Sequence, residues 1–135
     1  MVKKIGLLGG FLFLLLSVVS CDKFESTKTI TGVWRCKEYY QGGEGYRSYY
    51  VSVESYSQID TNSFVILNMY NLGYDFETIV QRKNDVFTIL GSSDVSFAIS
   101  GKGTFDPVSY TIDWTYSVSG SGISDPVVST LFEKP

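Results

Sequence analysis

A strict two-residue alternation of apolar and polar side chains runs through residues 110–118 and sets the structural class of the chain. Apolar or aromatic residues occupy every even position from Tyr110 to Val118, and polar residues such as Asp113 and Ser117 occupy the odd positions. Successive side chains of a strand point to opposite faces, so this pattern predicts a β-strand with one buried face. It is the clearest strand in the sequence.

Seven further segments also read as strands, and short polar or glycine-rich turns separate them. β-Branched and aromatic residues are frequent in these segments, whereas Ala98 is the only alanine of the chain. That composition favours strands, and no window beyond the first 20 residues has the spacing of apolar residues that a helix requires. The predicted strands are residues 33–40, 47–56, 63–70, 76–81, 86–90, 95–105, 110–118 and 127–132.

Strands that follow one another through short turns, without a crossover helix, predict an antiparallel meander. Eight such strands either close into a barrel or divide into two packed sheets. Closure removes the exposed edges of the sheet, and Gly101 and Gly103 would allow a sharp bend in a long strand. We therefore expect an all-β, eight-stranded antiparallel meander barrel, with a two-sheet β-sandwich as the alternative.

The start of the chain predicts an export signal. Two lysines precede a largely apolar stretch, residues 5–16, in the order that signal peptides show. Residues 18–21, Val-Val-Ser-Cys, resemble the lipobox of bacterial lipoproteins, which implies cleavage before Cys21 and lipidation of that cysteine. The apolar residues 5–19 are fewer than the roughly 20 that a membrane-spanning helix requires.

Three parts are therefore expected: a signal peptide (residues 1–20), a tether (21–30) and a barrel domain (31–135). The lipid on Cys21 would hold the protein on a membrane of the bacterial cell envelope, the outer membrane being the expected one. Whether it faces the periplasm or the cell surface stays open. With Cys21 lipidated, Cys36 has no cysteine partner, so we expect a buried thiol and no internal disulfide.

The charge of the mature chain limits its partners. Two of the 11 basic residues lie in the signal, so nine remain against 14 acidic residues, a net charge of −5. Nucleic-acid binding needs a basic face that displaces counterions, and docking on anionic lipid needs basic clusters. We therefore expect neither a nucleic-acid partner nor electrostatic membrane binding, and the membrane contact would be the lipid alone.

Several segments resemble a known family. Residues 31–34, Thr-Gly-Val-Trp, resemble the Gly-x-Trp that opens the first strand of lipocalins and related calycins. Residues 66–73, 99–105 and 110–116 are similar to those of small lipocalin-like lipoproteins of the Bacteroidetes type. This resemblance implies a calycin-like barrel with Trp34 plugging one end.

The chain departs from that family in two ways. Lipocalins usually set an arginine of the last strand against the tryptophan, whereas this chain offers only Glu133 and Lys134 there. A C-terminal helix is also missing. We therefore expect the chain to be related to the lipocalin architecture more than to the ligand-carrying subfamilies of lipocalins.

The sequence indicates no catalytic chemistry. It contains no histidine, which removes Ser–His and Cys–His nucleophilic sites and the commonest zinc ligand. Asp106, Asp113 and Asp125 lie in three separate segments, so we assign them turn-forming and solvating roles rather than glycosidase or calcium chemistry. We expect no enzyme, no metal and no cofactor.

Large residues on the faces assigned inward define a candidate ligand cavity. A small apolar or aromatic ligand could lie there, with tyrosine hydroxyl groups orienting it. Alternatively, side chains fill the interior, because an eight-stranded barrel is just wide enough for them. The cavity residues are Trp34, Tyr49, Phe97, Ile112, Trp114 and Tyr116.

Tyrosines assigned to the outer surface suggest a second function. They gather around the glycine-rich turn at residues 42–45, and tyrosine is enriched at protein interfaces. The alternative is therefore a structural or protein-interaction subunit of an envelope complex, although such tyrosines also pair across strands. The tyrosines are Tyr39, Tyr40, Tyr46 and Tyr50.

Overall fold

The computed structural model describes residues 29–41, 44–57 and 59–135. Residues Thr31–Pro135 form one compact unit. The predicted signal peptide, the lipidation site Cys21 and most of the predicted tether lie outside the described residues. Within the described ranges, no helix has the length and apolar character needed to cross a membrane.

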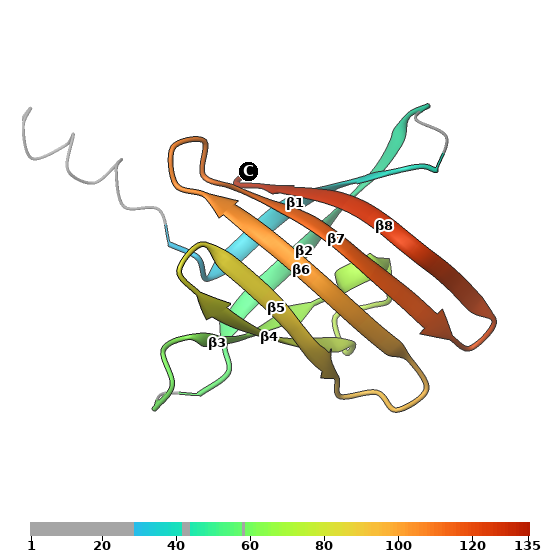
Figure 1. Ribbon diagram of the computed structural model, residues 1–135, viewed down its shortest axis with the longest axis horizontal. Helices are drawn as coiled ribbons and strands as arrows, with labels where there is room; N and C mark the ends of the chain where they lie inside the picture. Colours follow the sequence, from blue (N-terminus) through green and yellow to red (C-terminus); the bar gives the residue numbers. More distant parts are fainter. Residues whose placement is uncertain (1–28, 42–43, 58) are drawn as a thin grey trace, which may run out of the picture. The chain divides into compact units, whose positions relative to one another are not determined.

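Eight strands form a closed antiparallel barrel in which each strand pairs with its neighbours in the sequence (Figure 1). The last strand returns to the first, and Cys36 lies opposite Phe132 in that pairing. The predicted meander barrel is thus confirmed, rather than the sandwich. The strands are β1 (Gly32–Tyr39), β2 (Tyr46–Ser55), β3 (Ser63–Leu67), β4 (Glu77–Lys83), β5 (Val86–Ser92), β6 (Ala98–Asp106), β7 (Thr111–Gly120) and β8 (Ile123–Glu133).

Strand β3 is shorter than the sequence predicted. It ends at Leu67, and a 3-10 turn, η1 (Met69–Asn71), follows it. Asn68 and Tyr70 have positive φ angles of 70° and 59°, which a β-ladder does not accommodate. The Asn68 side chain stabilises the turn, since it donates to the Tyr50 carbonyl at 2.7 Å and accepts from the Gly73 N–H at 2.7 Å. The turn carries Tyr70 to one end of the barrel.

Strand β6 begins three residues later than predicted. The Asp94 carboxylate accepts a hydrogen bond from the Ser96 N–H at 2.9 Å, an Asx-turn that holds the chain outside the ladder. Val95 is therefore 99% exposed, and Phe97 precedes the strand. The prediction that this strand begins at residue 95 and includes Phe97 is therefore wrong.

Strand β8 is longer than predicted because it contains a bulge. Its pairing with β7 shifts register between Tyr116 and Val118, so that Tyr116 lies opposite Val128 and Val118 opposite Asp125. Pro126 falls in the bulge, where its missing N–H breaks no ladder hydrogen bond. Since paired residues share a face and Val118 is buried, the bulge turns Asp125 toward the inside of the barrel.

One end of the barrel is closed by aromatic rings. Trp34 is fully buried and stacks on Tyr110, with ring centroids 5.7 Å apart and planes 3° apart. Lys134 also contacts this ring: its Nζ lies 4.4 Å from the Trp34 ring centroid and donates to the Thr31 carbonyl at 3.1 Å. The cationic group against Trp34 is therefore a lysine rather than the arginine that lipocalins usually place there.

Aromatic packing continues from this end into the barrel. The Trp114 ring lies 5.3 Å from Phe132 and 5.9 Å from Phe87, and the Phe87 ring lies 5.9 Å from Phe64. All four side chains are buried. The half of the barrel next to Trp34 is therefore a packed core.

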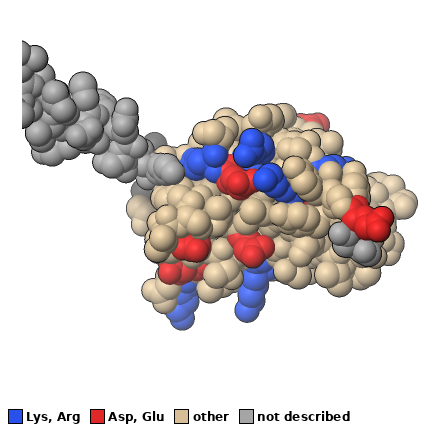
Figure 2. All heavy atoms as spheres, turned by 90° about the horizontal axis from the view of Figure 1, so that it is seen from above, with Lys and Arg blue, Asp and Glu red and all other residues tan. Residues whose placement is uncertain are grey.

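Charged side chains occur in small mixed groups on the outer surface. Glu133 on β8 pairs with Lys37 at 3.0 Å and with Arg35 at 3.7 Å, both on β1. On the face that Figure 2 shows, blue and red side chains lie side by side and uncharged surface surrounds them. That face has no continuous basic patch.

Candidate functional site

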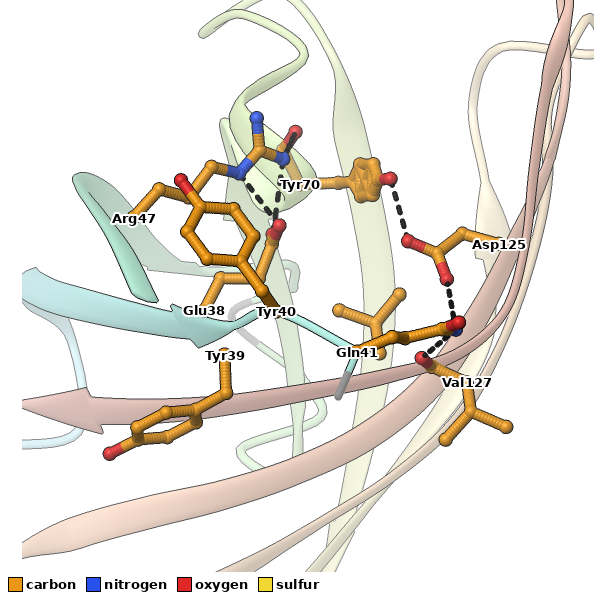
Figure 3. A pocket seen from close by; sticks show the side chains of 9 residues that line it. Glu38, Tyr39, Tyr40, Gln41, Arg47, Tyr70, Asp125 and Val127 are labelled. Atoms are coloured by element: carbon orange, nitrogen blue, oxygen red, sulfur yellow. Dashed lines mark hydrogen bonds and ion pairs between the residues drawn. The ribbon is translucent and has the colours of Figure 1, made fainter. Parts of the chain in front are cut away.

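The end of the barrel opposite Trp34 contains a pocket of about 320 Å³, here called the mouth pocket (Figure 3). It is formed by the end of β1 and the residues after it, the start of β2, η1 and the bulged part of β8. Tyr39, Val127 and Val128 complete its wall. Its main polar residues are Glu38, Tyr40, Gln41, Arg47, Tyr70 and Asp125.

Glu38 and Arg47 form an ion pair at the base of the mouth pocket. They lie opposite each other on β1 and β2, and Arg47 donates from Nε to Oε2 at 2.6 Å and from Nη2 to Oε1 at 3.1 Å. Glu38 is buried, and the Tyr49 hydroxyl also donates to its Oε1 at 2.9 Å. This bidentate geometry gives strong, charge-assisted hydrogen bonds, so the buried carboxylate is fully compensated.

Arg47 also connects this pair to η1. Its Nη2 donates to the Tyr70 carbonyl at 3.0 Å, and its guanidinium carbon lies 4.9 Å from the Tyr70 ring centroid. Burial lowers the pKa of Arg47, but its hydrogen bond and charge interaction with Glu38 raise that pKa overall. Arg47 therefore stays protonated and holds the backbone of Tyr70 against β2.

A second hydrogen-bonded group lies across the mouth pocket. The Tyr70 hydroxyl donates to Asp125 Oδ2 at 2.8 Å, and Gln41 Nε2 donates to Asp125 Oδ1 at 3.1 Å and to the Val127 carbonyl at 3.2 Å. Burial and the neighbouring Asp125 raise the pKa of Tyr70 to about 12. At neutral pH Tyr70 is therefore a hydrogen-bond donor that orients the carboxylate (Figure 3).

The two carboxylates of the mouth pocket differ in their charge balance. Glu38 is paired with Arg47. Among the described residues, Asp125 accepts hydrogen bonds from neutral groups only and forms no ion pair. With one cationic and two anionic side chains, the pocket lining has a net charge of −1. That charge resides on Asp125.

A polar layer separates the mouth pocket from the aromatic core. The Tyr116 ring meets the Tyr70 ring edge-on at 6.5 Å, beneath the mouth. Its hydroxyl lies near those of Tyr49 and Thr130, but has hydrogen-bond geometry toward neither within the described chain. The Thr130 hydroxyl is likewise buried and unpaired there. The interior thus becomes more polar toward the mouth.

The residues of the predicted ligand cavity lie elsewhere. Trp34, Tyr49, Ile112, Trp114 and Tyr116 are at most 8% exposed and point into the barrel. Phe97 instead lies outside β6, half-buried, with its ring edge-on to Phe76 at 5.3 Å. None of these six residues lines the mouth pocket.

The four tyrosines assigned to the surface are exposed. Their exposed fractions range from 44% for Tyr39 to 52% for Tyr40. The Tyr39 and Tyr46 rings contact each other edge-on at 5.9 Å, and the Lys37 ammonium lies 5.5 Å from the Tyr46 ring centroid. Tyr40 alone projects toward the Glu38–Arg47 pair, while the Tyr39 ring points away from it (Figure 3).

Comparison with known proteins adds no further assignment. No protein-family model, curated protein or solved structure matches the sequence. Among the described side chains, no group of three His, Cys, Asp or Glu residues is placed to hold a metal ion. The function must therefore be argued from the mouth pocket itself.

Proposed function

We propose that this chain is a lipid-anchored lipoprotein of the bacterial cell envelope whose barrel binds a small organic molecule at its mouth, without catalysing a reaction. It would belong with the small lipocalin-like lipoproteins of the Bacteroidetes type. The mouth pocket carries the proposal: its volume, about 320 Å³, falls within the range of small-molecule sites. Its side chains converge from three strands and η1.

The polar lining of the mouth pocket indicates which kind of ligand would fit it. The sequence suggested a small apolar ligand among the aromatic residues of the interior, but those rings pack closely on one another. The mouth pocket combines tyrosine rings with a carboxylate and an amide. Such a lining favours a ligand with polar groups beside an apolar part, because buried polar groups need partners.

A binding role without catalysis agrees with the side chains present. Nucleophilic catalysis requires a residue activated by a neighbouring base, and the chain contains no histidine. Burial, followed by the nearby Glu38 charge, raises the pKa of the Cys36 thiol. Cys36 is thus kept in its unreactive, protonated form.

Native mass spectrometry of protein purified from its own host tests the proposal. We expect a small-molecule adduct on the wild-type protein and a loss of most of it in Tyr40→Ala, which removes a ring of the mouth pocket. Tyr50→Ala is the matched control, since Tyr50 is 49% exposed but lies outside the pocket. A wild-type protein without any adduct, or an adduct that Tyr40→Ala retains in full, would contradict the proposal.

The second candidate is a protein-interaction subunit, which the exposed tyrosines of the β1–β2 outer face favour. Tyr46 and Tyr50 lie on β2, outside the mouth pocket, and each is 49% exposed. Aromatic residues of this kind are enriched in interfaces. Photo-crosslinking in the host from position 50 would support this candidate if one envelope protein were captured, and would argue against it if no protein were.

A further inference from the structure

The unpaired charge of the mouth pocket defines a class of ligand, and this inference rests on the proposed function. We propose that the ligand carries a cationic amine, which Asp125 binds through its carboxylate while the Tyr40 ring packs against the adjoining part of the molecule.

Only one of the two carboxylates of the mouth pocket is available to a ligand. Both oxygens of Glu38 accept hydrogen bonds from Arg47, and Oε1 also accepts one from Tyr49. Breaking such a buried pair leaves an uncompensated charge, which is strongly unfavourable. A ligand would therefore leave the Glu38–Arg47 pair intact and interact with Asp125.

Asp125 is held in place by hydrogen bonds and can still accept further ones. Each of its oxygens receives one hydrogen bond, from Tyr70 and from Gln41, whereas a carboxylate offers about four acceptor positions in all. Neither donor brings a positive charge. An ammonium group would supply both the missing donors and the missing charge, and charge-assisted hydrogen bonds are about twice as strong as neutral ones.

An aromatic surface lines the same pocket as Asp125. The Tyr70 ring already has the Arg47 guanidinium 4.9 Å from its centroid, so it is not the free partner. The Tyr40 ring is 52% exposed and lines the pocket. Its backbone N–H donates to the Gly45 carbonyl at 3.2 Å, which limits the direction of the side chain. An exposed aromatic face attracts organic cations.

Anionic ligands fit this site poorly. The pocket lining has a net charge of −1, and the mature chain has nine basic and 14 acidic residues. A carboxylate or phosphate group would face Asp125 without a free cationic side chain of the pocket, because Arg47 is already paired with Glu38. Like charges at close range destabilise a complex.

A charge series of one molecular shape tests the inference. Isothermal titration calorimetry at low salt would compare phenethylamine, phenethyl alcohol and phenylacetate, whose head groups are positive, neutral and negative. We expect the amine to bind about tenfold more tightly than the alcohol and the carboxylate to bind most weakly. Added salt should weaken amine binding and leave alcohol binding nearly unchanged, because salt screens charges.

Two variants test whether Asp125 causes the preference for the amine. Asp125→Asn should remove the preference for the amine, whereas Asp113→Asn, which removes the same charge from the exposed face of β7, should keep it. The inference is overturned if the alcohol or the carboxylate binds as tightly as the amine, or if the preference survives in Asp125→Asn. The Tyr40-dependent adduct of the native protein tests the proposed function separately, since it would persist whatever the charge of the ligand.

Discussion

Tyr70 links the backbone of η1 to Arg47 and to Asp125 in the mouth pocket. Its φ of 59° is unusual for a residue other than glycine, and such conformations cost about 1–3 kcal/mol. The contacts of Tyr70 offset this cost: its carbonyl accepts from Arg47, and its hydroxyl donates to Asp125. A residue in a strained conformation with both ends hydrogen-bonded is well suited to position Asp125.

The raised pKa of Tyr70 predicts a loss of stability at alkaline pH. Its pKa rises from 10.0 to about 12 in the folded protein, mainly through burial, so the unfolded chain releases this proton first. The stabilising contribution is therefore complete below pH 10.0 and is lost as the pH rises toward 12. Urea unfolding at a series of pH values should show the free energy of unfolding falling over this interval.

Substitution of Tyr70 tests that assignment. Tyr70→Phe should lower the free energy of unfolding at neutral pH by about 1 kcal/mol, the value of a hydrogen bond, and make the alkaline decline less steep. Tyr56→Phe, at a residue that is 56% exposed, should change neither quantity. An unchanged decline in Tyr70→Phe would show that the titration of other groups, such as Tyr49 and Tyr116, causes it.

Among the elements, β6 is adapted to the large side chains of β7. Gly103 lies opposite Trp114, and a Cβ atom at Gly103 would approach the indole ring to 2.7 Å. At Gly101 a Cβ would collide with the Thr115 carbonyl oxygen. The sequence suggested a bend here, and the structure shows the reason for both glycines to be close contact with β7.

A substitution in β6 measures this contact. Gly103→Ala should destabilise the protein by about 1–3 kcal/mol, because the added methyl group overpacks the core. Lys102→Ala, at the exposed position between the two glycines, should change the stability by less than about 0.5 kcal/mol. Thermal unfolding of both variants checks the difference, and equal melting temperatures would refute the packing argument.

The bulge of β8 shows how an element can create a site residue. Without the register shift, the inward positions of Val128, Thr130 and Phe132 would continue to Pro126, and Asp125 would face outward. A one-residue shift moves every following side chain to the other face. The mouth pocket therefore depends on one irregularity of the ladder.

At the scale of the whole molecule, the barrel has two unlike ends. The Trp34 end is packed with rings and contacted by Lys134, whereas the opposite end holds the Glu38–Arg47 ion pair, tyrosines and the mouth pocket. Apolar burial is the main source of folding free energy, so the packed end is suited to stability and the mouth to recognition.

The attachment of the whole molecule to a membrane is the remaining prediction. Because the lipobox implies lipidation of Cys21, the wild-type protein expressed in its host should incorporate labelled palmitate and sediment with membranes. Cys21→Ser should lose the label and become extractable without detergent, since each buried methylene adds about 0.8 kcal/mol to membrane affinity. Cys36→Ser, at the buried cysteine of β1, is the control and should keep the label. Labelled Cys21→Ser protein would refute the lipid anchor.

Part of the mouth pocket was readable from the strand periodicity. Glu38 follows Trp34 and Cys36 at two-residue spacing, and Arg47 precedes Tyr49 in the same way, so both belong to inward faces. Sequence reasoning missed Glu38 and Arg47 as site residues, because charged side chains are rarely placed inside a barrel unless they are paired. Their pairing is visible only in the register of β1 against β2.

Periodicity and turn composition determined the all-β class, the order of the eight strands and their meander, because these features depend on local alternation and neighbouring turns. They favoured a barrel over a sandwich, but only the pairing of β1 with β8 in the tertiary structure decides between the two. The meeting of Tyr70 and Asp125 in the mouth pocket was also decided by the tertiary structure alone. A left-handed turn after β3 and a bulge in β8 bring them together, and neither irregularity follows the two-residue period by which a strand is recognised.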